Sequence, residues 1–595
     1  MPDAREGDVF QLVLIKPSHY DDDGYVIQFL KSTIPANSLA CLYGLAQDCA
    51  QRRALGPDVE IRLTACDEMN TRVNVDRIAK SILASGNHGV VAMVGVQSNQ
   101  FPRAVDLARE FAQRGIQVAI GGFHISGCLA MLPELPPDLE EALELGITLY
   151  AGELEGRMDE FLTAAYRKEL KPLYNYMEEL PGLDGEPVPY LPLSLIKRTA
   201  SNRTSFDAGR GCPYLCSFCT IINVQGRRSR TRTADDVERV ARLNLAQGVT
   251  NFFISDDNFT RNQAWQPIFE RLAKLREEEG HDIRLMIQVD TMSHKVPGFI
   301  ELAKRAGTNR VFIGLESINP DALKGARKSQ NRITDYRAML QAWRGIGALT
   351  FAGYILGFPN DTPETIERDI RIIQRELPVD ILEFFILTPL PGSQDHQELH
   401  LKGVPMASDM NLYDTAHVTT AHPLMSKEQW ESIFHRAWEL YYSHAHVETL
   451  LRRGKFYGFP LVNLMVKCLS FSGCMRFEGV HPLDGGLLRR KYRRDRRPGL
   501  PIEPPVIFHL KYLAELVSKY ARFSALILRC AWLTLRVSLR DAQAASKDDV
   551  ALTPTSEEEL ETLEIFTSTP QAREAVDRAR KRARRRGIGA VSAGN

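Results

Sequence analysis

Three cysteines, Cys212, Cys216 and Cys219, lie close together in the sequence with the spacing CxxxCxxC. This spacing places three thiolates on one short loop, and Cys thiolate is the usual ligand of iron–sulfur clusters. Because no fourth cysteine lies nearby, a four-iron four-sulfur cluster held here keeps one iron open to an external ligand. A structural zinc site needs four ligands, and the following residues supply neither His nor Cys over a distance of about 25 positions. The pattern therefore favours a cluster over zinc or three unrelated structural cysteines.

Polar and glycine residues follow several of the strands that we predict downstream of this loop. They are Asp256, Asp257, Gln288, Asp290, Glu316 and Gly357. The carboxyl ends of parallel strands meet at one edge of a sheet or barrel, so we expect these residues to face one mouth. For Asp256 and Asp257, a helix N-cap is the alternative interpretation.

The elements that must position these residues form two runs of alternating strand and helix patterns. Residues 8–165 contain five predicted strands, and residues 201–400 contain about six strand–helix units. Continuous apolar strands that alternate with helices are typical of parallel sheets covered on both faces. We therefore predict an α/β protein with a doubly wound, flavodoxin-like N-terminal domain, a partial (β/α)6 barrel and a mostly helical C-terminal region. The predicted strands are 9–15, 59–64, 90–95, 117–120 and 147–150, then 204–208, 251–255, 284–289, 310–315, 351–356 and 381–386.

Three further regions complete the predicted organisation. Residues 166–200 contain five prolines and are predicted to be a linker. Residues 401–545 have mostly helical patterns, and residues 546–595 form a basic tail that we expect to be flexible. Dense basic runs at 489–497 and 578–586 are expected to be solvated or disordered, with contact to anionic lipid or nucleic acid as the alternative.

Composition narrows the functional classes. The chain has 595 residues, ten cysteines and a formal net charge of zero, so neither a disulfide scaffold nor a general affinity for polyanions is expected. The first residues lack a signal-peptide pattern, and a cytoplasmic protein is expected. No apolar run is long enough to span a bilayer. Residues 523–539 form an amphipathic helix interrupted by arginines, which either docks on the core or lies on a membrane surface.

The cysteine loop, with Phe218 between its last two cysteines, resembles that of the radical S-adenosylmethionine (SAM) superfamily. The segment Gly314-Leu315-Glu316-Ser317 is similar to the Gly-Ile-Glu-Ser segment of that family. The resemblance implies that the open iron binds the amino and carboxylate groups of SAM. It also implies that the reduced cluster cleaves SAM to methionine and a 5′-deoxyadenosyl radical, with electrons from a reductant such as flavodoxin or ferredoxin. The family often has a Gly-Gly-Glu-like turn where this chain has Asp256 and Asp257, whose carboxylates still suit an ammonium group.

The N-terminal domain, placed before such a barrel, resembles the cobalamin-binding class of radical SAM proteins. The matching segments are Gly121-Gly122-Phe123-His124 and residues 151–155. This resemblance implies that cobalamin lies between the two domains. The candidate contacts are Ser98, Asn99, Gly121, Gly122, His124, Gly152 and Glu153. Residues 66–72, after the second strand, contain no His that would ligate cobalt. The lower axial ligand is thus left open, and a domain without cofactor that serves as an interaction module is the alternative.

These resemblances imply a cobalamin-dependent methyltransferase that acts on an unactivated carbon of a small or lipid-like substrate. One alternative is an oxidative cyclase resembling the anaerobic magnesium-protoporphyrin cyclase. Methylthiotransferases are disfavoured, because Cys41, Cys49, Cys66 and Cys128 are not spaced for a second cluster. A cobalamin- or cluster-binding regulator that reaches nucleic acid is the non-enzymatic alternative. It is also disfavoured, since a regulator needs no open iron.

Overall fold

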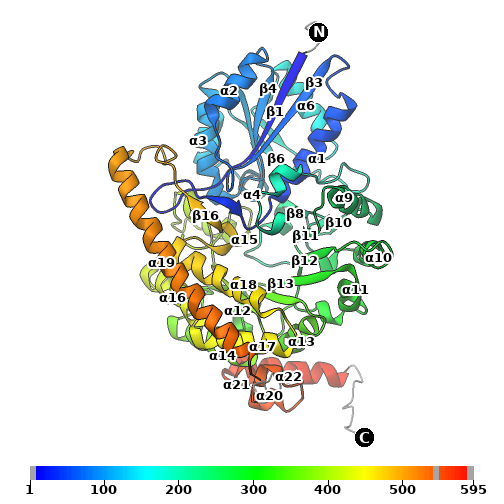
Figure 1. Ribbon diagram of the computed structural model, residues 1–595, viewed down its shortest axis with the longest axis vertical. Helices are drawn as coiled ribbons and strands as arrows, with labels where there is room; N and C mark the ends of the chain where they lie inside the picture. Colours follow the sequence, from blue (N-terminus) through cyan, green and yellow to red (C-terminus); the bar gives the residue numbers. More distant parts are fainter. Residues whose placement is uncertain (1–7, 541–547, 586–595) are drawn as a thin grey trace.

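The computed structural model describes residues 8–540 and 548–585. Two six-stranded sheets dominate it, one from the N-terminal residues and one from residues 203–386. They follow one another along the long axis of the molecule (Figure 1). The helices that follow the second sheet in the sequence pack against it on the side of its last strand. The predicted α/β fold class is confirmed.

The first sheet is parallel throughout, with strand order β3-β1-β4-β5-β6-β7. After β1 the chain forms β3 on one side of it and then β4 on the other side. The order of strands therefore reverses between β1 and β4, and ligands bind at such a switch point in sheets of this kind. Five strands match the predicted ones, and the sixth, β7, comes from the predicted linker at 166–200. The strands are β1 (Asp8–Lys16), β3 (Val59–Asp67), β4 (Gly89–Met93), β5 (Gln117–Gly121), β6 (Thr148–Ala151) and β7 (Leu173–Asn175).

Helices cover both faces of this sheet. Along β1, Leu12 and Leu14 enter one hydrophobic core, whereas Val13 and Ile15 enter another. This alternation follows from the two-residue period of a strand and explains the continuous apolar sequence. The helices are α1 (Asn37–Arg52), α2 (Val75–Ala84), α3 (Phe101–Ala112), α4 (Phe123–Met131), α5 (Pro137–Glu144) and α6 (Met158–Arg167).

The second sheet is also parallel, with strand order β15-β14-β13-β12-β11-β8, and its end strands β8 and β15 do not pair with each other. It is the predicted partial barrel of six strands. The strands are β8 (Arg203–Phe206), β11 (Asn251–Ile254), β12 (Arg284–Val289), β13 (Thr308–Glu316), β14 (Leu349–Leu356) and β15 (Ile381–Ile386). The helices that follow them are α9 (Ala234–Ala246), α10 (Trp265–Glu277), α11 (Phe299–Ala306), α12 (Pro320–Gly325), α13 (Tyr336–Gly345), α14 (Pro363–Glu376) and α15 (Gln394–Leu401).

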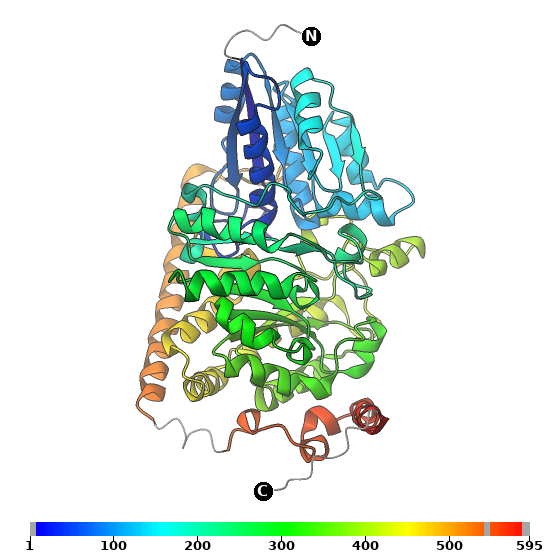
Figure 2. The same cartoon turned by 90° about the vertical axis from the view of Figure 1, so that its right-hand side faces the viewer.

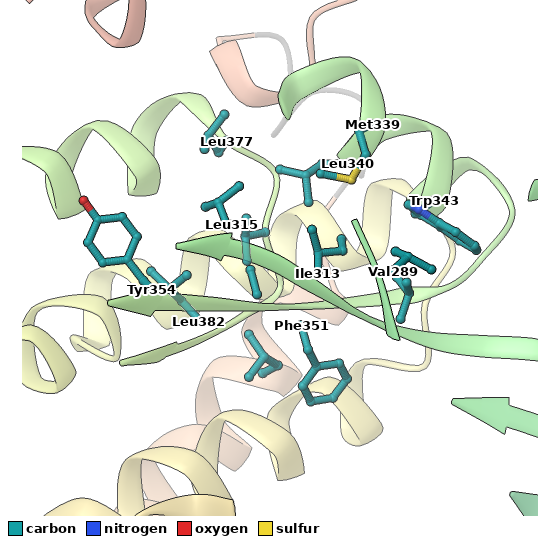
Figure 3. Close-up of a cluster of buried hydrophobic side chains, with 14 of the residues drawn as sticks. Val289, Ile313, Leu315, Met339, Leu340, Trp343, Phe351, Tyr354, Leu377 and Leu382 are labelled. Carbon is teal, nitrogen blue, oxygen red and sulfur yellow. The ribbon is translucent and has the colours of Figure 1, made fainter. Parts of the chain in front are cut away.

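The outer face of this sheet packs on its helices. Ile313 and Leu315 of β13 point toward Leu340 of α13, while Phe351 of β14 lies on the opposite side of the sheet (Figure 3). The outer core is thus apolar and closed, and alternate residues of the same strands face the barrel interior.

The C-terminal region contains the helices α16 (Lys427–Tyr441), α17 (His444–Phe456), α18 (Leu461–Gly473), α19 (Pro505–Ser538) and α22 (Pro570–Arg585). The predicted amphipathic segment is the second half of α19, a helix of 34 residues that runs along one side of the molecule (Figures 1 and 2). Most of the tail that we expected to be flexible is described: α22 packs against α21 (Glu564–Thr567). No helix in residues 8–540 or 548–585 combines the length and apolarity needed to cross a membrane.

The basic run at 489–497 is folded, which corrects our expectation that it is solvated or disordered. It begins in β16 (Gly486–Arg490), which pairs antiparallel with β2 (Gln28–Ser32) of the N-terminal region. Arg489 forms an ion pair with Asp21, and Arg497 with Asp409. Part of the positive charge of this run is therefore neutralised by acidic residues that are distant in the sequence.

Candidate active site

The cysteine loop follows β9 (Gly209–Arg210) and ends at the short helix α8 (Ile221–Val224). The backbone turns sharply at Gly211, whose φ is +93°. A side-chain carbon there would lie only 2.4 Å from the carbonyl oxygen of Arg228. The N–H of Cys212 donates to the carbonyl of Gly226 at 3.2 Å. Only glycine fits this approach of the two ends of the loop.

The three thiols form one neighbourhood. Burial raises the pKa of Cys212 to about 11 and that of Cys219 to about 12, and the nearby Asp257 and Cys216 add to both shifts. Bound iron would hold these groups as thiolates, because a metal stabilises the deprotonated ligand. Within the described residues, no three Cys, His, Asp or Glu side chains converge as the ligands of a single ion do. Cys thiolates are the usual ligands of iron–sulfur clusters, so the donor set fits a cluster.

Asp290, which we predicted to contact SAM, is hydrogen-bonded to the cysteine loop. Its carboxylate accepts a hydrogen bond from the hydroxyl of Tyr214, a residue of the cysteine loop, at 3.0 Å. It also pairs with Arg261 at 2.7 Å and accepts from the amide of Asn258. Although burial opposes ionisation, the hydrogen bonds from Arg261 and Asn258 lower the pKa of Asp290. The structure therefore places Asp290 as a fixed anion that holds Tyr214.

Glu316 lies on the other side of the loop, in an ion pair with Lys328. The Lys328 ammonium stands 5.8 Å from the ring centroid of Phe218. Burial would lower its pKa, but the charges of Glu316 and Cys216 raise it. The amide of Gln330 donates to the Cys216 sulfur at 3.6 Å. Sequence analysis missed Lys328 and Gln330, because they lie in a loop after α12 that carries no motif.

The two adjacent aspartates after β11 have different surroundings. Asp256 is saturated: it accepts from the N–H groups of Ala208 and Gly209 and from the amide of Asn262. This arrangement fixes the chain that enters the cysteine loop. Asp257 lines a cavity, and burial raises its pKa to about 7. Of the pair, Asp257 is the carboxylate that a ligand can reach.

The cavity has a volume of about 740 Å³ and is lined by both domains. Its barrel wall includes Gln288, whose amide donates to the carbonyl of Asp256 at 3.2 Å. The cysteines do not line it themselves, but their neighbours Arg210 and Thr220 do. Pockets of this size bind small molecules and cofactors in many proteins.

The N-terminal wall of the cavity contains six of the seven residues predicted to contact cobalamin. They are Ser98, Asn99, Gly121, Gly122, Gly152 and Glu153. They lie at the carboxyl ends of β4, β5 and β6 or just beyond, where a doubly wound sheet binds its ligand. Because glycine has no side chain, the three glycines of this wall leave room for a flat ligand to approach the backbone.

His124 does not line this wall. Its ring nitrogens contact the hydroxyl of Ser98 at 3.2 Å and the carboxylate of Asp138 at 2.8 Å. Among the described lining residues, His481 is the one histidine, and its ring bonds to the Phe384 carbonyl and the Leu483 N–H. Both ring nitrogens of each of these two imidazoles therefore take part in hydrogen bonds within the protein.

Gly357, predicted near SAM, contacts the C-terminal region instead of the cavity. Its N–H donates to Asp361 at 2.9 Å. A side-chain carbon at Gly357 would lie 1.9 Å from the indole ring of Trp430 in α16. The glycine is thus required by packing at this position.

An ionic network joins the two domains next to the cysteine loop. Glu153 and Glu155, from the N-terminal domain, pair with Arg210 at 2.8 and 2.6 Å. Arg210 also pairs with Asp207 at 2.9 Å, and Arg230 pairs with Glu153. Sequence analysis identified Glu153 only as a possible cofactor contact. Its partners are more than fifty residues away and share no pattern with it.

Comparison with known families identifies the barrel. The profile of the radical SAM superfamily matches residues 208–373, which begin just before the cysteine loop. Residues 208–373 of this chain belong to the radical SAM superfamily. The four-iron four-sulfur cluster and SAM are therefore its expected cofactors, and the predicted family is confirmed.

Curated relatives of this radical SAM protein include two methyltransferases. It is 29% identical to bacteriochlorophyllide d C-12(1)-methyltransferase of Chlorobaculum tepidum over 51% of this chain and 64% of the relative. It is 25% identical to hopanoid C-2 methylase of Rhodopseudomonas palustris over 52% of this chain and 56% of the relative. The chain thus spans less than two thirds of the length of either relative.

Solved structures share the fold. The radical SAM methyltransferase TsrM from Kitasatospora setae, solved with cobalamin and a four-iron four-sulfur cluster, superposes with a TM-score of 0.54 at 17% identity. The match covers 78% of this chain and 99% of that one. The cobalamin-dependent SAM radical enzyme OxsB, with aqua-cobalamin and SAM bound, gives a TM-score of 0.51 at 14% identity. That match covers 96% of this chain and 83% of the OxsB chain.

Proposed function

We propose that this protein is a cobalamin-dependent radical SAM methyltransferase that methylates an unactivated carbon. The observation that carries the proposal is the single cavity, which joins the neighbourhood of the cysteine loop to the ligand-binding edge of the N-terminal sheet. When bound, the cluster and SAM supply a radical that removes a hydrogen atom from the substrate, and cobalamin supplies the methyl group. The named relatives, both carbon methyltransferases, support the same activity.

The residues of the chain have distinct roles in this proposal. Cys212, Cys216 and Cys219 would hold the cluster. Asp257 accepts from the SAM ammonium, since it is the cavity-lining carboxylate of the aspartate pair. On the opposite wall, Ser98 and Asn99 bind polar groups of cobalamin, and the glycines at 121 and 122 let it approach the backbone. The protein orients these groups and excludes water from them.

Cleavage of SAM is the first test. The full chain, reconstituted anaerobically with iron and sulfide, is reduced in the presence of SAM, and 5′-deoxyadenosine is measured by mass spectrometry. We expect product from the natural chain and none from Cys212→Ala. Cys128→Ala is the matched control, because Cys128 is a buried single thiol in α4. Equal activity of the Cys212 variant, or no product from the natural chain, refutes the proposed function.

Cobalamin binding is the second test, read from the absorbance of cobalamin that remains with the chain after gel filtration. Asn99→Phe places a large ring in the N-terminal wall of the cavity and should abolish retention. Gln113→Phe, at an exposed position beyond α3, should retain cobalamin as the natural chain does. Retention by both variants contradicts a site at this wall. With a substrate in hand, methyl transfer from deuterated SAM separates methylation from the oxidative cyclase alternative.

We also propose that the protein works in the cytoplasm with α19 on an anionic membrane surface and receives electrons from a flavodoxin or ferredoxin. The outward side of α19 is apolar: Val506 is 71% exposed, Leu528 71% and Leu510 63%. The exposed cations Arg522 and Arg529 have no ion-pair partner among the described residues. Apolar side chains with flanking cations suit an interface rich in anionic lipid.

Vesicle flotation tests this contact. The chain should float with vesicles of phosphatidylcholine and phosphatidylserine and much less with phosphatidylcholine alone. Leu528→Glu together with Trp532→Glu should abolish flotation, while Leu243→Glu, on the exposed side of α9, should not. Unchanged flotation of the α19 variant contradicts the contact. Binding to nucleic acid instead of vesicles would support the regulatory alternative.

A further inference from the structure

The interior of the barrel is an apolar tunnel that continues the cavity toward the amino ends of the strands. Its wall residues occur at alternate positions, as the two-residue period of a strand requires. They are Phe253 of β11 with Ser255 just beyond it, Met286 and Gln288 of β12, Arg310 and Phe312 of β13, Phe351 of β14, and Glu383 and Phe385 of β15. Gly353 follows Phe351 on the same face, and a side chain there would meet Phe312 and Phe385 at 3.2 and 3.3 Å. The missing side chain keeps the tunnel open.

Two cations lie at the floor of this tunnel without a counter-charge. Arg310 begins the inward row of β13, and Lys467 reaches the same space from α18. Neither side chain forms a hydrogen bond or an ion pair with any of residues 8–540 or 548–585. Burial, together with repulsion by Arg310, lowers the pKa of Lys467 to about 8, and burial lowers the pKa of Arg310. Two neighbouring like charges with no partner are costly, since burying an unpaired charge is unfavourable.

A third polar group, Glu383, lies higher in the tunnel. It is 2% exposed, and its Oε2 has no hydrogen-bond partner. Its strand position is level with Gly353 and Gly314, four residues above Arg310, or about 13 Å along the strand. Burial raises the pKa of Glu383 to about 8, so its carboxyl is largely protonated at neutral pH and can donate a hydrogen bond.

We propose that Arg310 and Lys467 bind the anionic end of an elongated, largely apolar substrate, and that Glu383 donates a hydrogen bond to a polar group farther along it. This inference rests on the proposed function, because it names the substrate class of the same cavity. Both cations aim into the tunnel, and a carboxylate or phosphate there supplies the missing counter-charge. The ring-lined wall suits a hydrocarbon or aromatic body.

The position of the site also fixes the length of the substrate. Arg310 and Glu316 are six residues apart on β13, which corresponds to about 20 Å along the strand. Glu316 belongs to the surroundings of the cysteine loop through Lys328. A substrate held at the floor therefore presents to the reacting groups a carbon far from its anionic end. An acid with a short chain that is bound at the floor does not reach the reacting groups.

Binding of a matched pair of probes tests this site. Hexadecanoic acid and its neutral amide, hexadecanamide, are equilibrated by dialysis with the full, cluster-reconstituted chain in the absence of reductant. We expect the acid to bind at least about tenfold more tightly than the amide, as one charge-assisted pair allows. Arg310→Met and Lys467→Met should each reduce this preference to about threefold or less. Lys304→Met, an exposed cation of α11 without an ion-pair partner among the described residues, should preserve it.

Three results overturn the inference. They are equal binding of acid and amide by the natural chain, failure of both to bind, and an unchanged preference in the Arg310 and Lys467 variants. The last result would place the acid elsewhere, for example along α19. Because the assay contains no reductant, it does not depend on SAM cleavage. A chain that binds the acid through Arg310 but forms no 5′-deoxyadenosine refutes the proposed function and leaves the anion site standing.

Discussion

Arg210, which precedes the cysteine loop by two residues, pairs with Glu155 of the N-terminal domain at 2.6 Å, and both side chains are nearly inaccessible. Glu155 and Asp207 both hold Arg210, and Glu153 extends the network to Arg230. Although burial opposes ionisation, Arg210 lowers the pKa of Glu155. The entrance to the cysteine loop is thereby tied to the edge of the N-terminal sheet that lines the cavity. The relative position of the two cofactor walls depends on this contact.

Removing one partner of this network should be costly. Glu155→Ala leaves Arg210 buried with fewer anions, and we expect a loss of about 3 kcal/mol in the free energy of unfolding. The exposed pair of Glu60 and Arg62 gives the control, since Glu60→Ala should cost less than about 1 kcal/mol. Urea unfolding followed by circular dichroism measures both. Equal effects of the two variants would contradict a structural role for the network.

The pH dependence of the Glu155 contribution follows from its lowered pKa. A carboxylate whose pKa is lower in the folded state stabilises the protein above its unfolded pKa, and this stability is lost as the pH falls through the folded pKa. The difference in stability between the natural chain and Glu155→Ala should therefore shrink below about pH 4.5. Unfolding midpoints at pH 7 and pH 4 measure it. A difference that grows in acid would be inconsistent with the ion pair.

Asp257 should make SAM binding pH-dependent. Its pKa of about 7 in the free protein means that it is ionised in about half of the molecules at neutral pH. Since an ammonium group prefers the carboxylate, SAM affinity should increase about tenfold between pH 6 and pH 8. Equilibrium dialysis with SAM on the reconstituted chain checks this. Asp257→Asn should bind weakly and without this pH dependence, and an undiminished slope in that variant would exclude Asp257.

The raised pKa of Asp257 also predicts the sign of its effect on folding. A carboxyl whose folded pKa is above its unfolded value takes up protons on folding, so its ionisation destabilises the native state between about pH 4 and pH 7. Asp257→Asn should therefore unfold at a higher temperature than the natural chain at pH 8. The two should converge near pH 4. Asp256→Asn should be destabilised at both pH values, because its NH2 group cannot accept the hydrogen bond that the Asn262 amide donates to the Asp256 carboxylate.

Local sequence patterns were sufficient to predict the strands, but not the contacts between segments that are distant in the sequence. All six barrel strands and five strands of the first sheet were predicted, because the apolar runs and turn residues that define them are contiguous. The pairing of β2 with β16 joins residues separated by more than four hundred positions, and no local pattern encodes it. The basic run at 489–497 was misinterpreted for the same reason. Its counter-charges, such as Asp21, are distant in the sequence.

The site shows a similar limit. Cys212, Cys216 and Cys219 were identified from spacing alone, but the roles of neighbouring polar residues depend on which way each side chain points. Asp256 and Asp257 are adjacent, yet one is saturated by backbone N–H groups and the other faces the cavity. Arg310 and Lys467 carry no motif, and only the folded chain brings them together at the tunnel floor.

Gly357 should tolerate no side chain. Its φ of +102° is unfavourable for any residue other than glycine. In addition, the side-chain carbon of Gly357→Ala would collide with the Trp430 ring. We expect a loss of more than about 3 kcal/mol in the free energy of unfolding, combining backbone strain with overpacking. Gly280 also has a positive φ, +75°, but has open space around it, so Gly280→Ala should cost only about 1 kcal/mol. Similar losses for both variants would mean that the Trp430 contact is unimportant.

Arg310 and Lys467 should reduce stability in the free protein, which distinguishes a ligand site from a structural one. A buried cation without a partner destabilises the native state, and replacement by an apolar side chain of similar length removes that cost. We therefore expect Arg310→Met and Lys467→Met to raise the thermal unfolding midpoint by a few degrees, as about 1 kcal/mol does for a large domain. Hexadecanoic acid should raise the midpoint of the natural chain but not that of the double variant, because ligand binding stabilises only the form that binds it. Lower midpoints for both single variants would show that the cations have partners in the folded chain and would argue against an anion site at the floor of the barrel.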